Sequence, residues 1–449
     1  MAELSDLQKI LPNNASQFVN WFRSVSPYIH GHRGRTFVIS LSGEAVQSAQ
    51  ITYLLHDIAL LSSLGIRLVL VHGNRPQIEA GLQAKGLTSH YFRGQRVTDE
   101  IALHCAKAAC GEVSIEIQRY LSMGLANLPT VNVRIPIATG NFITARPLGI
   151  RDGVDYGYTG EVRRVDVAAI ARRLDEGCIV LISPIGYSPT GEVFNLLNED
   201  VAMAVASALH AAKWVCLSDS AGLFDNDGQL LRQLTLVQAQ QLLARNPQSV
   251  AADYRQLTNA VKACQNGVHR VHLVTRHVEG SLLLELFSRD GIGTLISTDE
   301  FDPIRKATIE DVGGLLELIQ PLEAMGILVR RSREKLEMEI DYFTVQERDG
   351  MIVACAALYS FAQEKMAELA CLAVHPHYRG ENRGDGLLAA LEHDAQQLGI
   401  TDIFVLTTHT AHWFQERGFI AADLDLLPIS RRALYNYQRK SKVFIKHLV

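Results

Sequence analysis

Two patterns of apolar positions divide this chain of 449 residues. From Arg35 onward, short continuous apolar runs alternate with segments whose apolar residues recur at helical spacing. The runs occupy residues 36–40, 66–73, 178–184, 213–219, 270–275 and 293–298. Continuous runs are typical of strands buried on both faces, so the pattern predicts an α/β domain with a mostly parallel sheet covered by helices.

The pattern changes near Lys306. Helical spacing over 309–324 and 334–340 precedes two apolar runs around Asp349-Gly350, which is a strong hairpin signal. Further strands are expected at 366–376, 402–408 and 442–448, and further helices at 387–398 and 411–418. Antiparallel strands with interposed helices predict an α+β domain. Because the polar stretch around Asp302-Pro303 suits a boundary, we expect domains at 1–298 and 304–449.

The residues before Arg35 form an appendage. Residues 17–29 have helical spacing, and Pro27 is expected to break the helix. Phe18, Trp21 and Phe22 would form an apolar stripe. Two interpretations stay open: the stripe packs on its own domain, or it contacts another subunit.

Composition excludes several function classes. Lys plus Arg number 43 and Asp plus Glu number 48, so the net charge of −5 argues against nucleic acid as a partner. Seven cysteines without a CxxC pair predict neither a disulfide framework nor a metal site, and they suit a reducing cytoplasm. The charged start does not resemble a signal peptide, and the chain contains no apolar run of membrane-spanning length, so we expect no membrane partner.

The segment Leu372–Leu388 carries the most specific chemistry. A strand ends at His375-Pro376, a turn rich in Gly and Arg follows, and a helix begins. Backbone N–H groups at such a junction bind phosphate, helped by the helix dipole. As a bare glycine-rich loop the signal would be weak.

The wider spacing, V-x-P-x-x-R-G followed by x-x-x-G and a Leu-Leu helix, resembles the pyrophosphate loop of the GNAT acetyltransferases. The resemblance covers 306–449 and implies acetyl-CoA as a co-substrate, with no permanently bound cofactor. It places Leu372, Val374, Arg379, Gly380, Asn382, Arg383 and Gly384 at the acetyl-CoA. This sequence departs from the GNAT pattern at two positions. Asn382 replaces a family glycine, and Phe414 replaces a tyrosine that protonates the leaving thiolate in many members.

In that family an amine attacks the thioester directly, so a base is needed. The resemblance favours Glu368 acting through water, whereas a solvent-facing Glu368 on an alternating strand is the alternative. Backbone N–H groups near Cys371 and Leu372 would polarise the acetyl carbonyl. Cys371 could instead be a nucleophile, but a free cysteine is more often inert packing.

Two cationic clusters flank this segment. Arg330 and Arg331 lie in the first, and Arg439 precedes Ser441 in the second. A charge run is usually a solvated face. Because Arg grips carboxylates bidentately, the two clusters also suit a substrate with two carboxylates, such as an acidic amino acid. We expect Arg330, Arg331, Cys371, Arg439 and Ser441 at that substrate.

The first domain resembles the amino-acid kinase family, above all acetylglutamate kinase, over residues 37–297. The matching segments are VLVHGNRPQI, FNLLNEDVA, LSDSAGLFD and the tail HLVTRHVEGSLLLELFSRDGIGTLI. The kinase chemistry is dismantled: Ser40 stands at the phosphate-binding lysine and Asn74 in the glycine loop, and Lys262 lies in a different frame from the second lysine. Asp219 remains but cannot act alone, so the resemblance implies a retained fold with a new role.

The retained tail indicates that role. In the arginine-inhibited kinases it holds L-arginine, and the corresponding residues here are Tyr28, His272, Glu285, Gly291 and Gly293. A carboxylate suits a guanidinium, and turn N–H groups suit a carboxylate. The alternative is that Glu285 and His272 are solvated and that the two glycines only turn the chain.

A kinase-like domain followed by a GNAT domain resembles the bacterial amino-acid N-acetyltransferases. The resemblance implies acetyl transfer to the α-amino group of L-glutamate as the first step of arginine biosynthesis, with feedback inhibition by L-arginine, in a cytoplasmic homo-hexamer. Two alternatives stay open: a phosphotransferase of the acetylglutamate kinase type with a vestigial GNAT domain, and a non-enzymatic arginine sensor.

Overall fold

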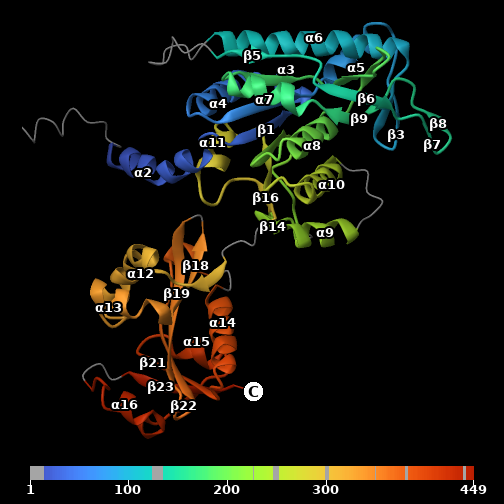
Figure 1. The fold of residues 1–449 in the computed structure, drawn as a ribbon. Helices are drawn as coiled ribbons and strands as arrows, with labels where there is room; N and C mark the ends of the chain where they lie inside the picture. The colour runs from blue at the N-terminus through green and yellow to red at the C-terminus, as the bar shows by residue number, and fades with distance from the viewer. Residues whose placement is uncertain are drawn as a thin grey trace, which may run out of the picture. The chain divides into compact units, whose positions relative to one another are not determined.

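The computed structural model describes residues 15–123, 135–225, 227–245, 252–298, 303–348, 350–379, 383–437 and 441–448. The chain separates into two compact units, Met1–Asp299 (unit 1) and Glu300–Val449 (unit 2), each with its own sheets and helices (Figure 1). Within the described residues, no helix has the length and apolar character needed to cross a membrane.

Unit 1 is built on an eight-stranded sheet. Its order is β14 (Gln233–Thr235), β16 (Thr294–Ser297), β15 (Arg270–Thr275), β13 (Lys213–Ser218), β1 (Thr36–Leu41), β2 (Arg67–His72), β10 (Ile179–Ile182) and β5 (Ile137–Ala138). Every pairing is parallel except β15–β16. The strands predicted from the apolar runs are confirmed, and so is the mostly parallel sheet.

Separate hydrophobic cores cover the two faces of this sheet. On β1, Val38 belongs to one core, and its neighbours Phe37 and Ile39 belong to the other. The first core includes residues of α8 (Asn198–Ala208) and α10 (Ala252–Gln265), and the second includes residues of α4 (Ile51–Ser63), α6 (Glu100–Ser122) and α11 (Ser281–Phe287). Alternation along a strand therefore divides apolar residues between two helical layers, which gives a three-layer sandwich.

A second sheet and two hairpins complete the strands of unit 1 in the described residues, and the apolar runs did not indicate them. The sheet has the order β12 (Val193–Asn195), β11 (Ile185–Tyr187), β6 (Ile143–Pro147) and β9 (Gly160–Val165). The hairpins are β3–β4 (His90–Phe92, Gln95–Val97) and β7–β8 (Ile150–Arg151, Val154–Asp155). The other helices are α3 (Gly43–Gln47), α5 (Arg75–Gln83), α7 (Val167–Asp175) and α9 (Leu236–Arg245).

The N-terminal helix differs from expectation. It is one helix, α2 (Ala15–His32), with Pro27 inside it, so the predicted break is wrong. Val25 packs into the second core, and the buried His32 ring lies 2.9 Å from the Leu286 carbonyl of α11 through Nε2. Tertiary packing of this face holds the helix across the proline. Trp21 and Phe22 are about half exposed, and the side chain of Phe18 lies outside the described residues.

Unit 2 contains a seven-stranded sheet. Its order is β17 (Ile304–Lys306), β18 (Phe343–Arg348), β19 (Met351–Phe361), β20 (Met366–Val374), β21 (Asp402–Thr407), β23 (Lys442–His447) and β22 (Ile420–Ala422). Only β20–β21 is parallel. The α helices are α12 (Val312–Ala324), α13 (Arg333–Met338), α14 (Arg383–Gln397), α15 (Ala411–Gln415) and α16 (Ile429–Arg432), and the 3₁₀ turns are η1 (Ile309–Asp311), η2 (Ile340–Tyr342), η3 (Pro376–Tyr378) and η4 (Leu424–Leu426). The predicted α+β pattern and its central hairpin are confirmed; β17 and β22 were not foreseen.

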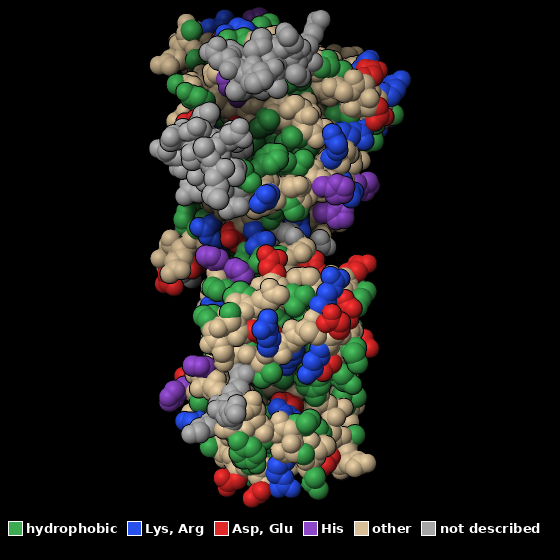
Figure 2. All heavy atoms as spheres, turned by 90° about the vertical axis from the view of Figure 1, so that its left-hand side faces the viewer, with side chains coloured by type: hydrophobic (Ala, Val, Ile, Leu, Met, Phe, Trp, Pro, Cys, Tyr) green, Lys and Arg blue, Asp and Glu red, His purple; other side chains and the backbone are tan. Residues whose placement is uncertain are grey.

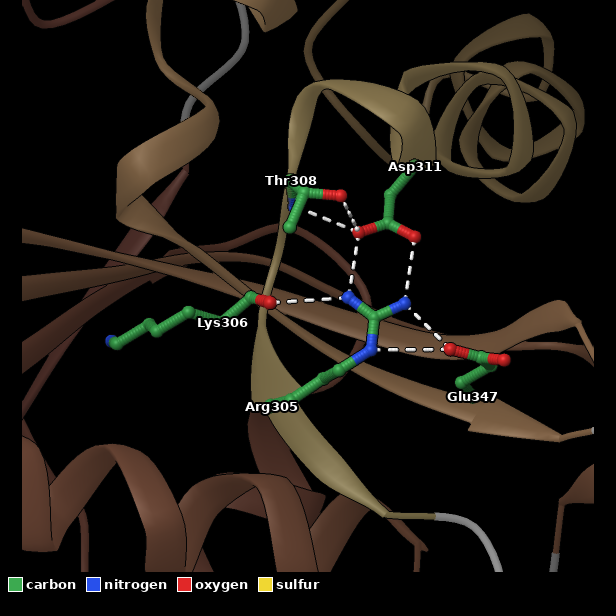
Figure 3. A network of polar contacts seen from close by, with 5 residues as sticks. All are labelled: Arg305, Lys306, Thr308, Asp311 and Glu347. Atoms are coloured by element: carbon green, nitrogen blue, oxygen red, sulfur yellow. Dashed lines mark hydrogen bonds and ion pairs between the residues drawn. The ribbon is translucent and has the colours of Figure 1, made fainter.

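A polar network fixes the start of unit 2 (Figure 3). Arg305 on β17 donates to both carboxylate oxygens of Asp311, at 2.7 and 2.8 Å, and also to Glu347 of β18. Asp311 in turn accepts from the backbone N–H of Thr308 and closes a capping box. The network joins the first strand, the turn before α12 and the hairpin.

The cysteines and the charged side chains are distributed as follows. All seven cysteines are free thiols, and all but Cys178 are buried. On the face drawn in Figure 2, basic and acidic side chains are interspersed instead of forming one large field of a single sign. This distribution agrees with the small net charge.

Candidate active site and candidate effector site

The two central strands of unit 2 separate along their length. β20 and β21 pair in parallel from Met366↔Asp402 to Glu368↔Phe404, where the register ends. Beyond that point β20 continues to Val374 and β21 to Thr407, and residues of both strands line a cavity. Strands that diverge in this way expose backbone N–H and C=O groups to whatever enters between them.

A bulge on the other side of β20 lies at the same level. Cys355 of β19 pairs with Ala373 and Ala357 pairs with Ala370, so Cys371 and Leu372 together oppose the single residue Ala356. Cys371 has φ 53°, a left-handed conformation that costs a non-glycine residue about 1–3 kcal/mol. The bulge changes the direction of the backbone at Cys371 and Leu372. The N–H groups near these residues are the ones that the sequence analysis expects at the acetyl carbonyl.

The cavity between the strands has a volume of about 580 Å³. Many of the lining residues are apolar, and the others include Tyr378 and Arg379, which follow β20, and the first residues of α14. The lining residues are Leu322, Ile327, Leu328, Leu369–Val374, Tyr378, Arg379, Arg383–Asp385, Val405–Thr407, His409, Thr410, Trp413, Phe414 and Arg417. A long ligand with an anionic group would fit this combination.

The part of the cavity that suits an anion is formed by the N-terminus of α14 and by arginines. Arg379 donates through Nε to the Val374 carbonyl, and the buried Arg383 donates to the Tyr378 carbonyl and lies over the Tyr378 ring. Gly384 is the second residue of α14 and lies beside Trp413; an added Cβ would lie 3.0 Å from that ring. Leu372, Val374, Arg379, Arg383 and Gly384, which the sequence analysis expects at acetyl-CoA, thus line one cavity, whereas Gly380 and Asn382 lie outside the described residues.

Glu368 is buried, so the alternative of a solvent-facing Glu368 is wrong. Its carboxylate forms a two-point ion pair with Arg431 of α16: Nε–Oε2 is 2.5 Å and Nη2–Oε1 is 2.9 Å. It stands where β20 and β21 part, next to the cavity-lining Leu369. Sequence reasoning did not identify Arg431; the only signal was the Arg-Arg pair at 431–432.

The other predicted substrate residues occupy different environments. Arg331 is half-buried and lies within electrostatic reach of Cys371, and its backbone N–H donates to Glu323. Arg330 is exposed, and neither arginine lines the cavity. The Ser441 carbonyl accepts from the Tyr435 hydroxyl at 2.6 Å, and Arg439 lies outside the described residues.

Phe414 lines the cavity with a buried ring packed against Trp413 and Phe419. It has no proton to give to a leaving thiolate. The hydroxyl oxygens of Thr407 and Thr410, 2.9 Å apart at the end of β21, line the same cavity. Sequence reasoning missed these two groups, since hydroxyls after a strand are common.

In unit 1, the positions of the kinase chemistry hold other groups. Ser40 is buried, where its hydroxyl accepts from the Trp214 indole N–H and donates to a carbonyl. The Asn74 amide donates to the Cys110 sulfur. Asp219 is paired with Arg276 and His277, and Lys262 is exposed on α10.

The predicted effector residues of unit 1 cluster at β15 and α11. His272 Nδ1 lies 2.7 Å from Glu285 Oε1, and Oε2 accepts from the N–H groups of Ile292 and Gly293. Although burial opposes it, these hydrogen bonds lower the pKa of Glu285 to about 2. Burial and the Lys213 charge lower the pKa of His272 to about 4.

Both His272 and Glu285 are buried, so the alternative of solvated side chains is wrong. A Cβ on Gly291, which has φ +58°, would meet the Glu285 carboxylate at 2.5 Å. One on Gly293 would meet the Leu273 carbonyl. Tyr28 packs against the core that contains Leu282 and Leu286 of α11. In this structure the Glu285 carboxylate accepts the hydrogen bonds of the Ile292 and Gly293 N–H groups, so these groups satisfy one another's hydrogen-bonding capacity.

Among the described residues, no group of three or more His, Cys, Asp or Glu side chains is arranged to hold a metal ion.

Comparison with known families agrees with the division into two units. The amino acid kinase family matches residues 35–275, and the acetyltransferase (GNAT) domain matches residues 339–421. The sequence is 53% identical to an amino-acid acetyltransferase from Pseudomonas putida over 433 residues, 96% of this chain and 99% of that protein. An amino-acid acetyltransferase from Azotobacter vinelandii is 52% identical over the same shares.

Solved structures give the same result. N-acetylglutamate synthase from Neisseria gonorrhoeae, complexed with coenzyme A and L-arginine, matches with a TM-score of 0.85 and 41% identity, covering 96% of this chain and 99% of that one. The same protein complexed with coenzyme A and N-acetyl-glutamate has a TM-score of 0.61. The fold class predicted from the two resemblances is therefore confirmed.

Proposed function

We propose the reaction on one premise: the chain belongs to the amino-acid acetyltransferase family, whose members it matches over 96% of its length. It transfers the acetyl group of acetyl-CoA to the α-amino group of L-glutamate, and the product is N-acetyl-L-glutamate. Both molecules bind as substrates, and no cofactor stays bound. The Neisseria structures, whose ligands are coenzyme A, L-arginine and N-acetyl-glutamate, support this choice.

One observation carries the proposal. The register of β20 and β21 ends at Glu368↔Phe404, and the cavity that follows ends at the N-terminus of α14 beside Arg379 and Arg383. A helix N-terminus with arginines suits the pyrophosphate of acetyl-CoA. The thioester arm then lies between the strands, where the backbone N–H groups near Cys371 and Leu372 polarise the acetyl carbonyl.

The acetyl group moves directly from sulfur to nitrogen. The glutamate ammonium loses a proton through water to Glu368, and the amine nitrogen forms a bond to the carbonyl carbon. The C–S bond then breaks, and the electron pair leaves with the sulfur as CoA thiolate. The amide nitrogen loses its second proton, which reaches the thiolate through water and gives CoA thiol. Thr407 and Thr410 are the hydroxyls placed to donate a hydrogen bond to that thiolate. Arg431 is a positioning residue, because it holds both oxygens of Glu368.

The carboxylates of glutamate meet arginines around this cavity. Arg331, near Cys371, and Arg330 form one group, and Arg439 and Ser441 form the other. Support comes from the half-buried position of Arg331 and from the Tyr435 hydroxyl, which donates to the Ser441 carbonyl next to β23. Bidentate pairing with two carboxylates favours glutamate over monocarboxylic amino acids.

L-Arginine is proposed as the feedback inhibitor, bound in unit 1 by Tyr28, His272, Glu285, Gly291 and Gly293. The buried carboxylate of Glu285 and the N–H groups of the 291–293 turn supply the charges that a guanidinium and a carboxylate need. Binding requires the ligand to replace the Glu285–turn hydrogen bonds. Such an inhibitor suits an enzyme at the first step of arginine biosynthesis.

The assembly is proposed to be a cytoplasmic homo-hexamer formed through the kinase-like units and α2. The half-exposed rings of Trp21 and Phe22 on α2 support a subunit contact there. Sedimentation of the wild type and of a Trp21→Ser/Phe22→Ser variant tests this. A hexamer that dissociates in the variant supports the contact, and a monomeric wild type contradicts it.

Product analysis tests the reaction. The chain is incubated with acetyl-CoA and, in parallel, with L-glutamate, L-aspartate or L-glutamine, and the acetylated product is identified by mass. We expect N-acetyl-L-glutamate at a kcat/KM well above the others. A parallel incubation with ATP and N-acetyl-L-glutamate tests the kinase alternative; phosphorylated product without acetyl transfer would contradict the proposal.

A further inference from the structure

The sheet of unit 2 carries, beside Glu368, a tyrosine that the proposed function does not use. Tyr359 of β19 pairs directly with Glu368 of β20 in the antiparallel register. Side chains of directly paired residues lie on the same face of a sheet, with Cβ atoms about 4.5–5.5 Å apart. Tyr359 also packs against the core that contains Cys371. The tyrosine is therefore a neighbour of the proposed base.

The Tyr359 hydroxyl contacts an acidic and a basic side chain. It donates to Glu339 Oε2 at 2.7 Å, and it also shares a hydrogen bond with the Arg331 side chain. Burial and the bond to Glu339 raise the pKa of Tyr359 above its usual value, so the hydroxyl keeps its proton. Because a guanidinium can only donate, the hydroxyl oxygen accepts from Arg331 while its proton is given to Glu339.

The ring of Tyr359 is held as well as its hydroxyl. The Tyr342 ring lies 5.0 Å from it between centroids, at an interplanar angle of 41°. Glu339 directly follows α13, and Tyr342 is the last residue of η2. A ring contact on one side and a hydrogen bond at the tip restrict rotation of the tyrosine side chain.

The Arg331 guanidinium has a donor left for a ligand. Its Nη1 donates to the Val329 carbonyl at 3.1 Å, whereas Nε is buried and has no hydrogen-bond partner. Leaving a buried donor unsatisfied costs about 1–3 kcal/mol, so a partner is expected. A carboxylate suits this position, because it accepts from two N–H groups along one edge of a guanidinium.

Glu339 could compete with a substrate carboxylate for Arg331, since it lies within electrostatic reach of the guanidinium. Both of its oxygens have other neighbours: Oε2 accepts from Tyr359, and Oε1 lies 3.8 Å from Lys335 Nζ. The Tyr359 hydroxyl therefore occupies the carboxylate that would otherwise draw the arginine away from the substrate.

We propose that Tyr359 is a positioning residue for the amino-acid substrate. Its hydroxyl, anchored by Glu339, directs the Arg331 guanidinium toward a carboxylate of L-glutamate while the substrate amine meets Glu368. This inference rests on the proposed function and adds a residue to it. Tyr359 acts through Arg331 and does not touch the reacting atoms.

Steady-state kinetics of Tyr359→Phe, with L-glutamate and acetyl-CoA varied separately, test this. We expect the KM for glutamate to rise roughly ten- to fiftyfold, because a hydrogen bond to a charged group is lost. The KM for acetyl-CoA and kcat should change by less than about threefold. Tyr342→Phe is the matched control: it keeps the ring contact with Tyr359 and should leave all three constants unchanged.

Further variants separate positioning from a merely structural role. Glu339→Gln keeps an acceptor for the hydroxyl and should retain the wild-type KM for glutamate, whereas Glu339→Leu should raise it as Tyr359→Phe does. In an Arg331→Ala background, Tyr359→Phe should have no further effect on kcat/KM for glutamate, because the two residues act as a unit.

The outcomes distinguish this inference from the proposed function. If the wild type acetylates glutamate and Tyr359→Phe has the same KM for it, the role of Tyr359 alone is overturned. A rise in both KM values together with a lower melting temperature, or a full effect of Tyr359→Phe without Arg331, would also overturn positioning. A wild type that does not acetylate glutamate would overturn the proposed function and this inference with it.

Discussion

At the scale of single residues, the ion pair between Glu368 and Arg431 is central to the candidate active site, because it holds the proposed base in place. Breaking such a buried pair leaves an uncompensated charge, so both residues matter to stability as well as to chemistry. The sequence identified Glu368 from its place before the loop, but it could not identify Arg431, 63 positions away. Contacts over such separations follow from the tertiary fold and not from spacing.

Replacing Glu368 by Gln should lower kcat by roughly 10²–10⁴-fold and change the KM for glutamate only a few-fold, because a base acts on the transition state. Steady-state kinetics over pH measure this. Glu392→Gln is the control, because it breaks a comparable half-buried pair with Lys446 outside the cavity. An unchanged kcat at every pH would exclude Glu368 as the base.

Replacing Cys371 by Ala tests whether the thiol is a nucleophile. We expect activity within about tenfold of wild type, because the proposed role of this residue belongs to its backbone. Loss of a covalent nucleophile would reduce kcat by more than about 10³-fold. Mass spectrometry for an acetylated protein intermediate distinguishes the two: an acetyl-enzyme would contradict direct transfer.

Three buried histidines predict a pH dependence of unit 1. Burial lowers the pKa values of His32, His72 and His272 to about 4, against about 6.5 when unfolded. The unfolded state therefore binds more protons below pH 6.5, and stability falls as the pH drops from about 6.5 to about 4. Each histidine contributes on the order of 2 kcal/mol between pH 7 and 5.

Urea unfolding at pH 7 and 5 measures this loss. His72→Asn should remove about a third of it, whereas His412→Asn, at an exposed position on α15, should not change it. Equal stability of unit 1 at both pH values would contradict burial of these rings.

At the scale of elements, the strands were predictable because their apolar runs are buried on both faces. β1, β2, β13 and β15 follow the predicted runs closely. The bulge at Cys371 and the early end of the β20–β21 register were not predictable, since they depend on which strands pair. α2 continued through Pro27 because packing on α11 outweighs the local preference.

Arg305 should contribute strongly to the stability of unit 2, because its guanidinium bonds Asp311 at both oxygens and also Glu347 (Figure 3). Arg305→Ala should lower the free energy of unfolding by roughly 2–3 kcal/mol. Arg432→Ala, whose partner Asp425 is exposed, should change it by less than about 1 kcal/mol. Thermal and urea unfolding compare the two variants; equal effects would contradict a structural role for the network.

At the scale of the whole molecule, two units with separate sheets combine a candidate acetyltransferase site with a kinase-like domain. The resemblance to the kinases places Ser40 where those proteins have their phosphate-binding lysine. Sequence motifs indicated both families, because loops that contact ligands keep local signatures. They could not show that the Glu285 carboxylate accepts hydrogen bonds from Ile292 and Gly293, or that Asn195 and Ser218 line a cavity of about 280 Å³ in unit 1. Those arrangements depend on side-chain packing.

The most direct test of the account is the release of CoA from acetyl-CoA by the full chain, with and without L-glutamate, and with and without L-arginine. We expect release that requires glutamate and is suppressed by arginine, with suppression weakened in Glu285→Gln while the uninhibited rate is retained. Glutamate-independent release, or none at all, would contradict the proposed reaction. Glutamate-dependent release that arginine leaves unchanged would contradict the effector site of unit 1.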